Sequence, residues 1–177
     1  RDTGLSVTSS GLPITESDLF DATNNCLQDS GVCSDEQKAA ASANLLAAKG
    51  WFVTLAPGEK NVGTATTISG TTLFNTNQPS ATAGGGACGS NLGIARSYLL
   101  SYKDATATTD VNATGTVTTA DRYTVHAGGG FLPSPVPVIV TIAGKKYQAV
   151  ISGTSVQNPG GLTLETRIRT YWRRKIE

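Results

Sequence analysis

The segment Val136–Ile142 constrains the fold more than any other stretch of this chain, because it is apolar at nearly every position. A strand with one face in water alternates apolar and polar residues, whereas this segment is apolar on both faces. Such a strand needs cover on both sides, as in stacked sheets or at the centre of a propeller blade. We therefore expect a protein built of layered β-sheets.

A tight hairpin is predicted earlier in the chain. Thr64–Ile68 and Thr71–Thr76 are rich in β-branched residues, and Ser69 and Gly70 between them suit a two-residue turn. Other strand-like runs are Leu5–Ser9, Trp51–Leu55, Ile94–Tyr102, the pair Val136–Ile142 and Tyr147–Ile151 around Gly144 and Lys145, and the last run, Leu162–Trp172. The fold class is therefore all-β.

One short helix is predicted over Ser34–Lys49. Ser34 with Gln37 three residues later forms a capping box, and alanine and leucine fill the interior. Gly50 is placed to end the helix. The segment 34–49 is thus a helical insertion in a single β-rich domain that spans residues 1–177.

The hairpins recur at intervals of roughly 40–50 residues, which is typical of four-stranded propeller blades. At most three blades fit into 177 residues, and a propeller needs at least four to close. The chain also begins at Arg1 without an initiator methionine or a charged-then-apolar leader. We expect the C-terminal fragment of a larger propeller, whose open edges associate with something else.

Composition argues against several classes of function. Charged residues make up 15 % of the chain and the formal net charge is +1, so no global field attracts nucleic acid. The longest apolar run is far shorter than the roughly 20 residues that span a bilayer. We expect neither a nucleic-acid partner nor a membrane span.

Three cysteines leave one unpaired. Cys26 and Cys33 enclose a short loop, and a disulfide between them would stabilise the fold by roughly 2–3 kcal/mol. The alternative is a pair of ordinary buried thiols, and Cys88 has no assigned partner. The spacing matches no common zinc finger, and the single histidine, His126, is distant in sequence.

One stretch has the spacing of a calcium loop. Asp110, Asn112, Thr114 and Asp121 occupy positions one, three, five and twelve, with Gly115 at position six. Position twelve is aspartate in place of the usual bidentate glutamate, and helical flanks are missing. The candidate cofactor is therefore calcium, and the alternative is a plain solvated loop.

No catalytic motif is found. His126 is the one side chain whose unperturbed pKa lies near neutrality, but the sequence holds no G-x-S-x-G elbow and no activating charge beside Cys88. We expect a protein that is not an enzyme. Near the C-terminus, one basic cluster is either a partner-docking surface or a solvated edge: Arg167, Arg169, Arg173, Arg174 and Lys175.

A longer pattern resembles a known family. It runs through Gly50, Trp51, Phe52, Val53, Leu55, Pro57, Gly58, Glu59, Phe74, Thr76, Pro79, Cys88, Gly89, Tyr98, Leu100 and Tyr102, with Asp18–Ala22 before it and Trp172 after it. This pattern is similar to the C-terminal propeller of the PilC/PilY family, the tip-associated adhesins and biogenesis proteins of bacterial type IV pili. That family's propeller calcium loop, with aspartate at alternating positions, has no counterpart in this sequence.

The resemblance implies a secreted or cell-surface protein that acts in pilus assembly and cell adhesion without catalysis. The implied partners are pilins, other tip proteins, the remainder of the propeller, and a host or abiotic surface. Two alternatives stay open: a structural subunit of an extracellular filament, and an extracellular carbohydrate-binding module.

Overall fold

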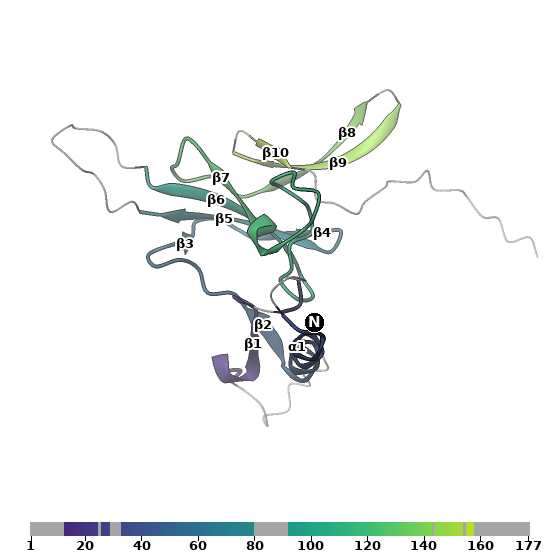
Figure 1. Cartoon of the computed structure of the whole chain (residues 1–177). Helices are drawn as coiled ribbons and strands as arrows, with labels where there is room; N and C mark the ends of the chain where they lie inside the picture. The colour runs from purple at the N-terminus through teal and green to yellow at the C-terminus, as the bar shows by residue number, and fades with distance from the viewer. Residues whose placement is uncertain are drawn as a thin grey trace, which may run out of the picture.

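The computed structural model describes residues 13–24, 26–28, 33–79, 92–142, 144–153 and 155–157. Over these ranges the protein is mostly β-sheet with one α-helix, and none of its sheets is closed (Figure 1). The strands are β1 Leu19–Asp21, β2 Gly50–Phe52, β3 Lys60–Asn61, β4 Thr66–Ile68, β5 Thr71–Gln78, β6 Ile94–Ser101, β7 Tyr123–His126, β8 Val136–Ile142, β9 Lys145–Ser152 and β10 Ser155–Gln157. The helix is α1 Asp35–Ala47, and short 3₁₀ turns cover Glu16–Asp18 and Thr119–Arg122.

The largest sheet is antiparallel and has β5 and β6 at its centre. Its order is β3-β5-β6-β7, with β4 also pairing β5. The hairpin between β4 and β5 is confirmed, and Ser69 and Gly70 have φ angles of 53° and 86°. Positive φ at both turn residues matches the twist of the flanking strands, and glycine adopts it without steric cost.

A second antiparallel sheet has the order β10-β9-β8. The expected hairpin of Val136–Ile142 with the following strand is present, but β9 begins at Lys145, so the turn lies one residue earlier than expected. Gly144 in this turn has a φ of 77°. Both β8 and β10 are edge strands in the described part of the sheet.

A lobe of α1 and the parallel pair β1–β2 forms the third unit. The predicted capping box is present, since Ser34 Oγ accepts from the Gln37 amide and Gln37 Oε1 accepts from the Ser34 amide. The helix is shorter than expected and ends at Ala47. Gly50 does not end it, because it is already the first residue of β2.

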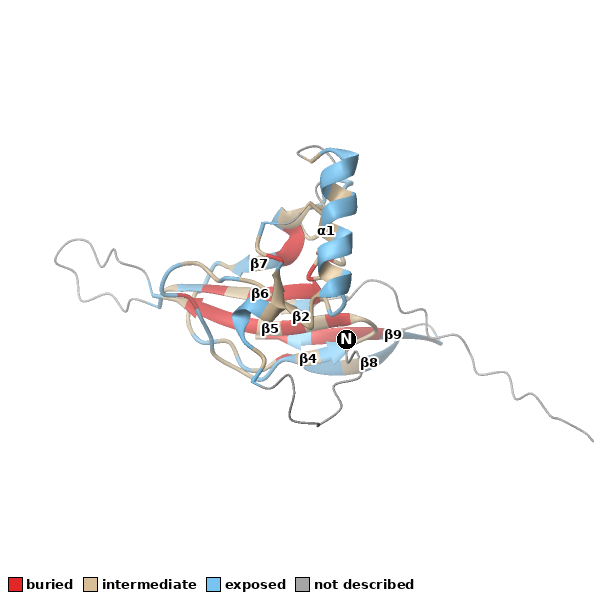
Figure 2. Ribbon diagram, turned by 90° about the horizontal axis from the view of Figure 1, so that it is seen from below, coloured by how far each residue is buried: buried red, intermediate tan, exposed pale blue. Residues whose placement is uncertain are grey.

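The sheets and the lobe form three layers, as Figure 1 shows. One face of the central sheet packs on the second sheet through Leu73, Leu99 and Val150. The opposite face packs on the β1–β2 lobe through Tyr98 and Leu100, with partly buried side chains such as Trp51. Figure 2 shows that β5 and β6 are the strands richest in buried residues, while α1 stands out from the sheet and has none.

The expectation that Val136–Ile142 is covered on both sides is wrong for the described part of the chain. Val136, Ile139 and Val140 are 54 %, 64 % and 40 % exposed. β8 is an edge strand, and only one side of its sheet lies against the central sheet. The strands covered on both sides are β5 and β6, whose sequences are far more polar.

Several sequence predictions lie outside the described residues. They are the strand Leu5–Ser9, the thiol of Cys88, the run Leu162–Trp172 and the basic cluster of Arg167, Arg169, Arg173, Arg174 and Lys175. No helix that the structure describes is long and apolar enough to span a bilayer.

Candidate functional site

The predicted calcium loop folds around two carboxylates that accept hydrogen bonds from its own backbone. Asp110 Oδ2 accepts from the Gly115 amide at 2.7 Å, and Oδ1 accepts from the Thr114 amide at 3.2 Å. Asn112 Oδ1 accepts from the same Thr114 amide at 3.2 Å. Gly115 has a φ of 85°, so the glycine at position six makes the sharp turn expected there.

Asp121, the residue at position twelve, is fully buried and accepts hydrogen bonds from the same loop. Its Oδ1 accepts from the amides of Val111 and Asn112, and its Oδ2 accepts from the amide and hydroxyl of Thr118. The carboxylate oxygens of Asp110 and Asp121 thus accept hydrogen bonds within the loop. Among the described residues, no group of three or more His, Cys, Asp or Glu side chains comes together.

Calcium sites use several carboxylates, and among the described residues no group of three or more acidic or metal-binding side chains comes together at this loop. We expect the melting temperature to be the same in excess calcium and in excess chelator. A rise in melting temperature with calcium that Asp110→Asn abolishes would show instead that the loop binds the ion.

The carboxyl of Asp121 predicts a pH dependence of stability. Burial acts to raise its pKa, but hydrogen bonds from Thr118, Asn112 and Val111 outweigh burial and hold the pKa below the ordinary value of 3.8. A depressed pKa gives stabilisation that is complete above the unfolded-state value and is lost as the pH falls through the folded-state value. The loop should therefore weaken below about pH 4.

We expect Asp121→Asn to lower the free energy of unfolding by about 1–3 kcal/mol at pH 7, since its amide nitrogen cannot accept from Thr118. The free energy of unfolding of this variant should also fall less between pH 5 and 3 than that of the unmodified chain. Urea unfolding at several pH values measures both effects. Asp35→Asn is the control, because the Asp35 side chain is fully exposed; equal pH profiles for all three proteins would contradict the assignment.

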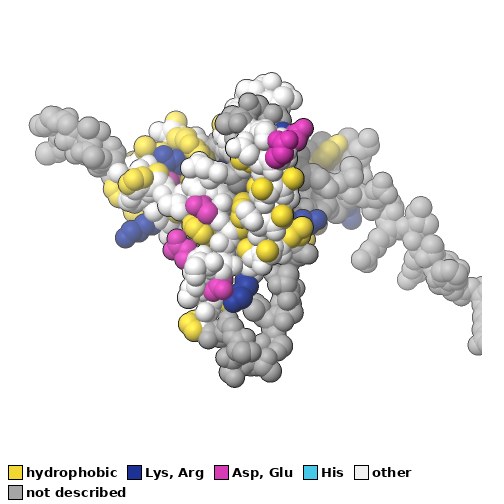
Figure 3. Space-filling view, turned by 60° about the horizontal axis from the view of Figure 1, so that its bottom comes forward, with side chains coloured by type: hydrophobic (Ala, Val, Ile, Leu, Met, Phe, Trp, Pro, Cys, Tyr) yellow, Lys and Arg dark blue, Asp and Glu magenta, His cyan; other side chains and the backbone are white. Residues whose placement is uncertain are grey.

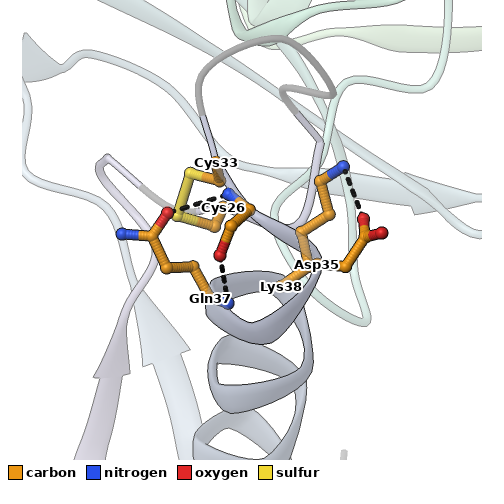
Figure 4. The surroundings of a disulfide bond; sticks show 6 residues. Cys26, Cys33, Asp35, Gln37 and Lys38 are labelled. Carbon is orange, nitrogen blue, oxygen red and sulfur yellow. Dashed lines mark hydrogen bonds and ion pairs between the residues drawn. A yellow bond between two sulfur atoms is a disulfide. The ribbon is translucent and has the colours of Figure 1, made fainter.

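A disulfide joins Cys26 and Cys33, whose Cα atoms lie 5.6 Å apart. Figure 4 shows that the bond sits directly above the first turn of α1, beside Gln37. Lys38 pairs with Asp35 at 3.6 Å on the same turn. The disulfide therefore anchors the start of a helix that buries no residue of its own.

Replacing both Cys26 and Cys33 by serine should lower the free energy of unfolding by about 2.5 kcal/mol, from the closure entropy of a loop of about eight residues. Because α1 has little other support, its amides should exchange with solvent faster than those of β5. Chemical unfolding and hydrogen exchange under non-reducing conditions test this, with the unmodified chain as the control. Unchanged exchange in α1 would contradict it.

A polar cluster links the two antiparallel sheets. Asn75 on β5, Ser97 on β6 and Ser152 on β9 are almost fully buried. Asn75 Oδ1 accepts from the hydroxyls of Ser97 at 2.7 Å and Ser152 at 2.8 Å, while its amide nitrogen donates to the Pro133 carbonyl. His126 Nε2 lies 2.8 Å from Ser97 Oγ.

The Ser97–His126 contact has the distance of a nucleophile and its base, but Asn75 competes for the single proton of Ser97. Each serine has one proton, and that of Ser97 is donated to Asn75 Oδ1. In this arrangement His126 Nε2 donates to Ser97 Oγ and does not accept the serine proton. Ser97 is also 1 % exposed, which leaves no path for a substrate. Burial lowers the pKa of His126.

On the face of the central sheet opposite the Asn75 cluster, the buried carboxylate of Glu59 interacts with four partners. Glu59 Oε2 lies 3.2 Å from an Arg96 guanidinium nitrogen and accepts from the Ala56 amide at 3.1 Å. Its Oε1 accepts from the hydroxyls of Thr76 and Tyr98. Burial, followed by the negative charge of Glu59, raises the pKa of Tyr98. A polar cavity of about 350 Å³ adjoins this group.

A second cavity, of about 510 Å³, lies beside the end of α1 and is lined mainly by apolar side chains such as Leu45, Trp51 and Tyr102. Trp51 Nε1 donates to the Tyr102 carbonyl at 3.0 Å, which ties the lobe to the central sheet. Figure 3 looks toward this end of the molecule and shows acidic and basic side chains interspersed. Neither sign of charge forms a patch on that view.

The most distinctive surface is the side of the second sheet that faces away from the central sheet. Residues paired directly across antiparallel strands lie on the same side, so the register places seven apolar residues together. The described side chains of this outer face are those of Val136, Val138, Val140, Tyr147, Ala149, Ile151 and Val156, and the same register also places Ile142 and Lys145 on this side. Val156 is 70 % exposed, and Tyr147 and Ile151 are 45 % and 40 % exposed.

Every side chain that the structure describes on this face is apolar, whereas exposed sheet faces usually carry polar residues. The three strands have seven, eight and three residues, and at about 3.3 Å by 4.8 Å for each residue they cover about 300 Å². This is within the range of the largest apolar patch on a typical monomer, which is often functional. The outer face is therefore the candidate functional site.

Comparisons with protein-family models, with curated proteins and with solved structures found no match for this chain.

Sequence reasoning identified β8 and most of β9 but missed β10, the third strand of the outer face. It missed the cluster of Asn75, Ser97 and Ser152 and the partners of Glu59. The signal available was the set of uncharged polar residues inside β5 and β6, which are unusual in strands covered on both faces.

Proposed function

We propose that this chain is a cell-surface binding module that takes part in type IV pilus assembly and adhesion. It binds pilins, other pilus-tip proteins or the remainder of a parent propeller through the outer face and the adjoining strand edges. The observation that supports this is the outer face, whose described side chains are apolar and on which Val156 and Val136 are more than half exposed. The resemblance to the PilC/PilY family supplies the pilus context.

The physical argument is that an apolar sheet face in water is unfavourable by roughly 25 cal/mol for each Å² left exposed. Natural sheets cover such a face or bind something with it. The disulfide agrees with an oxidising, extracellular location. Burial of the face by a partner therefore supplies the driving force of the proposed activity.

Co-sedimentation of the chain with sheared type IV pili tests this proposal. Val140→Asp places a charge on the outer face and should reduce the amount of chain that co-sediments with the pili, its capture, at least tenfold. Ile139→Asp is the matched control, because Ile139 is exposed on the same strand but points to the other side of the sheet. Equal capture of both variants, or none of the unmodified chain, would overturn the proposal.

A filament subunit is the second candidate, favoured by the edges of β8 and β10, which pair with no further strand in the described residues. Immunogold labelling of intact cells separates the two. Label concentrated at pilus ends supports the tip module, whereas label along whole filaments supports the filament subunit.

A further inference from the structure

We infer that the polar cavity of about 350 Å³ beside Glu59 binds an acidic sugar through its carboxylate, as a uronic acid would supply. The lining of this polar cavity comes from β6, from the segments that follow β1 and β2, and from the residues 119–123. It therefore lies on the face of the central sheet that packs on the β1–β2 lobe, whereas the outer face belongs to the second sheet. The inference goes beyond the proposed function, because it concerns a different part of the molecule.

The first argument is charge. Among the described residues, three charged side chains line the polar cavity: Arg96, Arg122 and Glu59. Two positive charges and one negative charge leave a formal charge of +1. The Arg96 side chain is 13 % exposed and Arg122 is 5 % exposed, and charges interact more strongly at such positions than in water. A carboxylate with one negative charge balances the cavity, whereas a phosphate monoester, at about −1.5 to −2, would exceed its charge.

The second argument is that both guanidinium groups are held in place. Arg122 Nη1 donates to the Thr23 carbonyl at 2.7 Å. Arg96 Nη1 lies 3.2 Å from Glu59 Oε2, and Arg96 Cζ lies 5.4 Å from the centre of the Tyr123 ring. Within the described residues, no hydrogen bond from Nε or Nη2 of Arg96 is found. Arg96 thus offers a ligand carboxylate further donors in a fixed orientation, and fixed donors lose little freedom on binding.

The third argument is the uncharged part of the lining. A cavity of about 350 Å³ is within the size range of sites for small organic ligands, which begins at about 300 Å³. The side chains of Thr23, Asn24 and Thr54 line it together with the ring of Tyr123. Hydroxyl and amide groups donate and accept hydrogen bonds, as sugar hydroxyls do. A simple aliphatic acid has no groups to match them, so the lining favours a sugar acid.

The fourth argument is access from solvent. Asn24, Thr54, Ala120 and Tyr123 are exposed, whereas Glu59 is buried. The exposed residues form the rim of the polar cavity, and the charged groups lie at its floor. A small sugar can therefore enter without unfolding either layer, whereas its carboxylate leaves bulk water when it reaches the arginines.

Glucuronate is the probe, with glucose as the neutral control, in ¹H–¹⁵N NMR titrations of the full chain. At the ligand efficiency typical of small organic ligands, glucuronate should bind with a Kd of about 1 mM. The shifted amide resonances should concentrate at Thr54 and at residues 119–123, while glucose at the same concentration leaves them in place. The Kd should rise with salt concentration, because the interaction is between charges.

Ala120 gives a matched pair of variants at an exposed position on the rim. Ala120→Glu adds a negative charge and should raise the Kd of glucuronate at least about fivefold, whereas Ala120→Gln adds nearly the same volume without charge and should change it less than about twofold. Val140→Asp adds a negative charge on the outer face and should leave this Kd unchanged. The same variant reduces capture by pili, so failure of the cavity site and failure of the proposed function are distinguishable.

Four results would overturn the inference. They are the absence of localised shifts at about 10 mM glucuronate, ten times the expected Kd; equal shifts with glucose; an equal Kd for Ala120→Glu and Ala120→Gln; and binding of acetate or inorganic phosphate at least as tight as that of glucuronate. The last result would show a site for a simple oxyanion, to which the sugar contributes nothing.

Discussion

Replacing Glu59 by alanine is expected to lower the free energy of unfolding by about 3–5 kcal/mol, the largest effect predicted for this protein. The Glu59 side chain is 1 % exposed and lies 3.2 Å from Arg96, whose own side chain is 13 % exposed. Removing the carboxylate leaves a largely buried guanidinium without its counter-charge. It also removes the acceptor for the hydroxyls of Thr76 and Tyr98.

Urea unfolding followed by circular dichroism measures this effect, with Glu16→Ala at an exposed position as the control. The double variant Glu59→Leu with Arg96→Met removes both charges and should be less destabilised than Glu59→Ala, since no buried charge is left unpaired. A loss below 1 kcal/mol in Glu59→Ala would show that the ion pair is not important for stability.

Replacing Asn75 by alanine should lower the free energy of unfolding by about 2–4 kcal/mol, because three hydrogen bonds are lost, two of them buried, and two serine hydroxyls lose their acceptor. The effect should be concentrated at the contact between the two antiparallel sheets, since Ser152 belongs to β9 and Ser97 to β6. Hydrogen exchange is therefore expected to rise more in β9 than in α1.

A double-mutant cycle with Ser152→Ala tests whether this cluster joins the sheets. We expect the two losses to be less than additive by at least 0.5 kcal/mol, because both variants remove the same hydrogen bond. Asn44→Ala, at an exposed position on α1, is the matched control and should be nearly neutral. Strict additivity would contradict the assigned link between Asn75 and Ser152.

Much of the local structure could be predicted from the sequence. The capping box of Ser34 and Gln37 lies at the start of α1 as predicted. The Ser69–Gly70 turn joins two strands as predicted, and both residues have positive φ. These features depend on interactions within a few residues, so the local sequence contains the information that specifies them.

The choice of the central strands could not be predicted. Hydrophobicity alone favours Val136–Ile142 as the covered strand, yet β5 and β6 lie between two layers and contain buried Asn75, Ser97 and Thr76. Their polar groups are tolerated because each is hydrogen-bonded inside the protein. The partners are distant in the chain: Asn75 bonds to Ser152 and Thr76 bonds to Glu59.

By itself, the sequence determined that this protein is built of β-hairpins with one capped helix, because turns, caps and strand periods are properties of neighbouring residues. Only the tertiary structure decided which strands are covered on both sides and which apolar face stays exposed. The physical reason is that burial of Asn75 or Glu59 depends on partners that no local pattern contains. The same holds for the outer face, whose seven apolar residues share one side of the sheet only through the register of three paired strands.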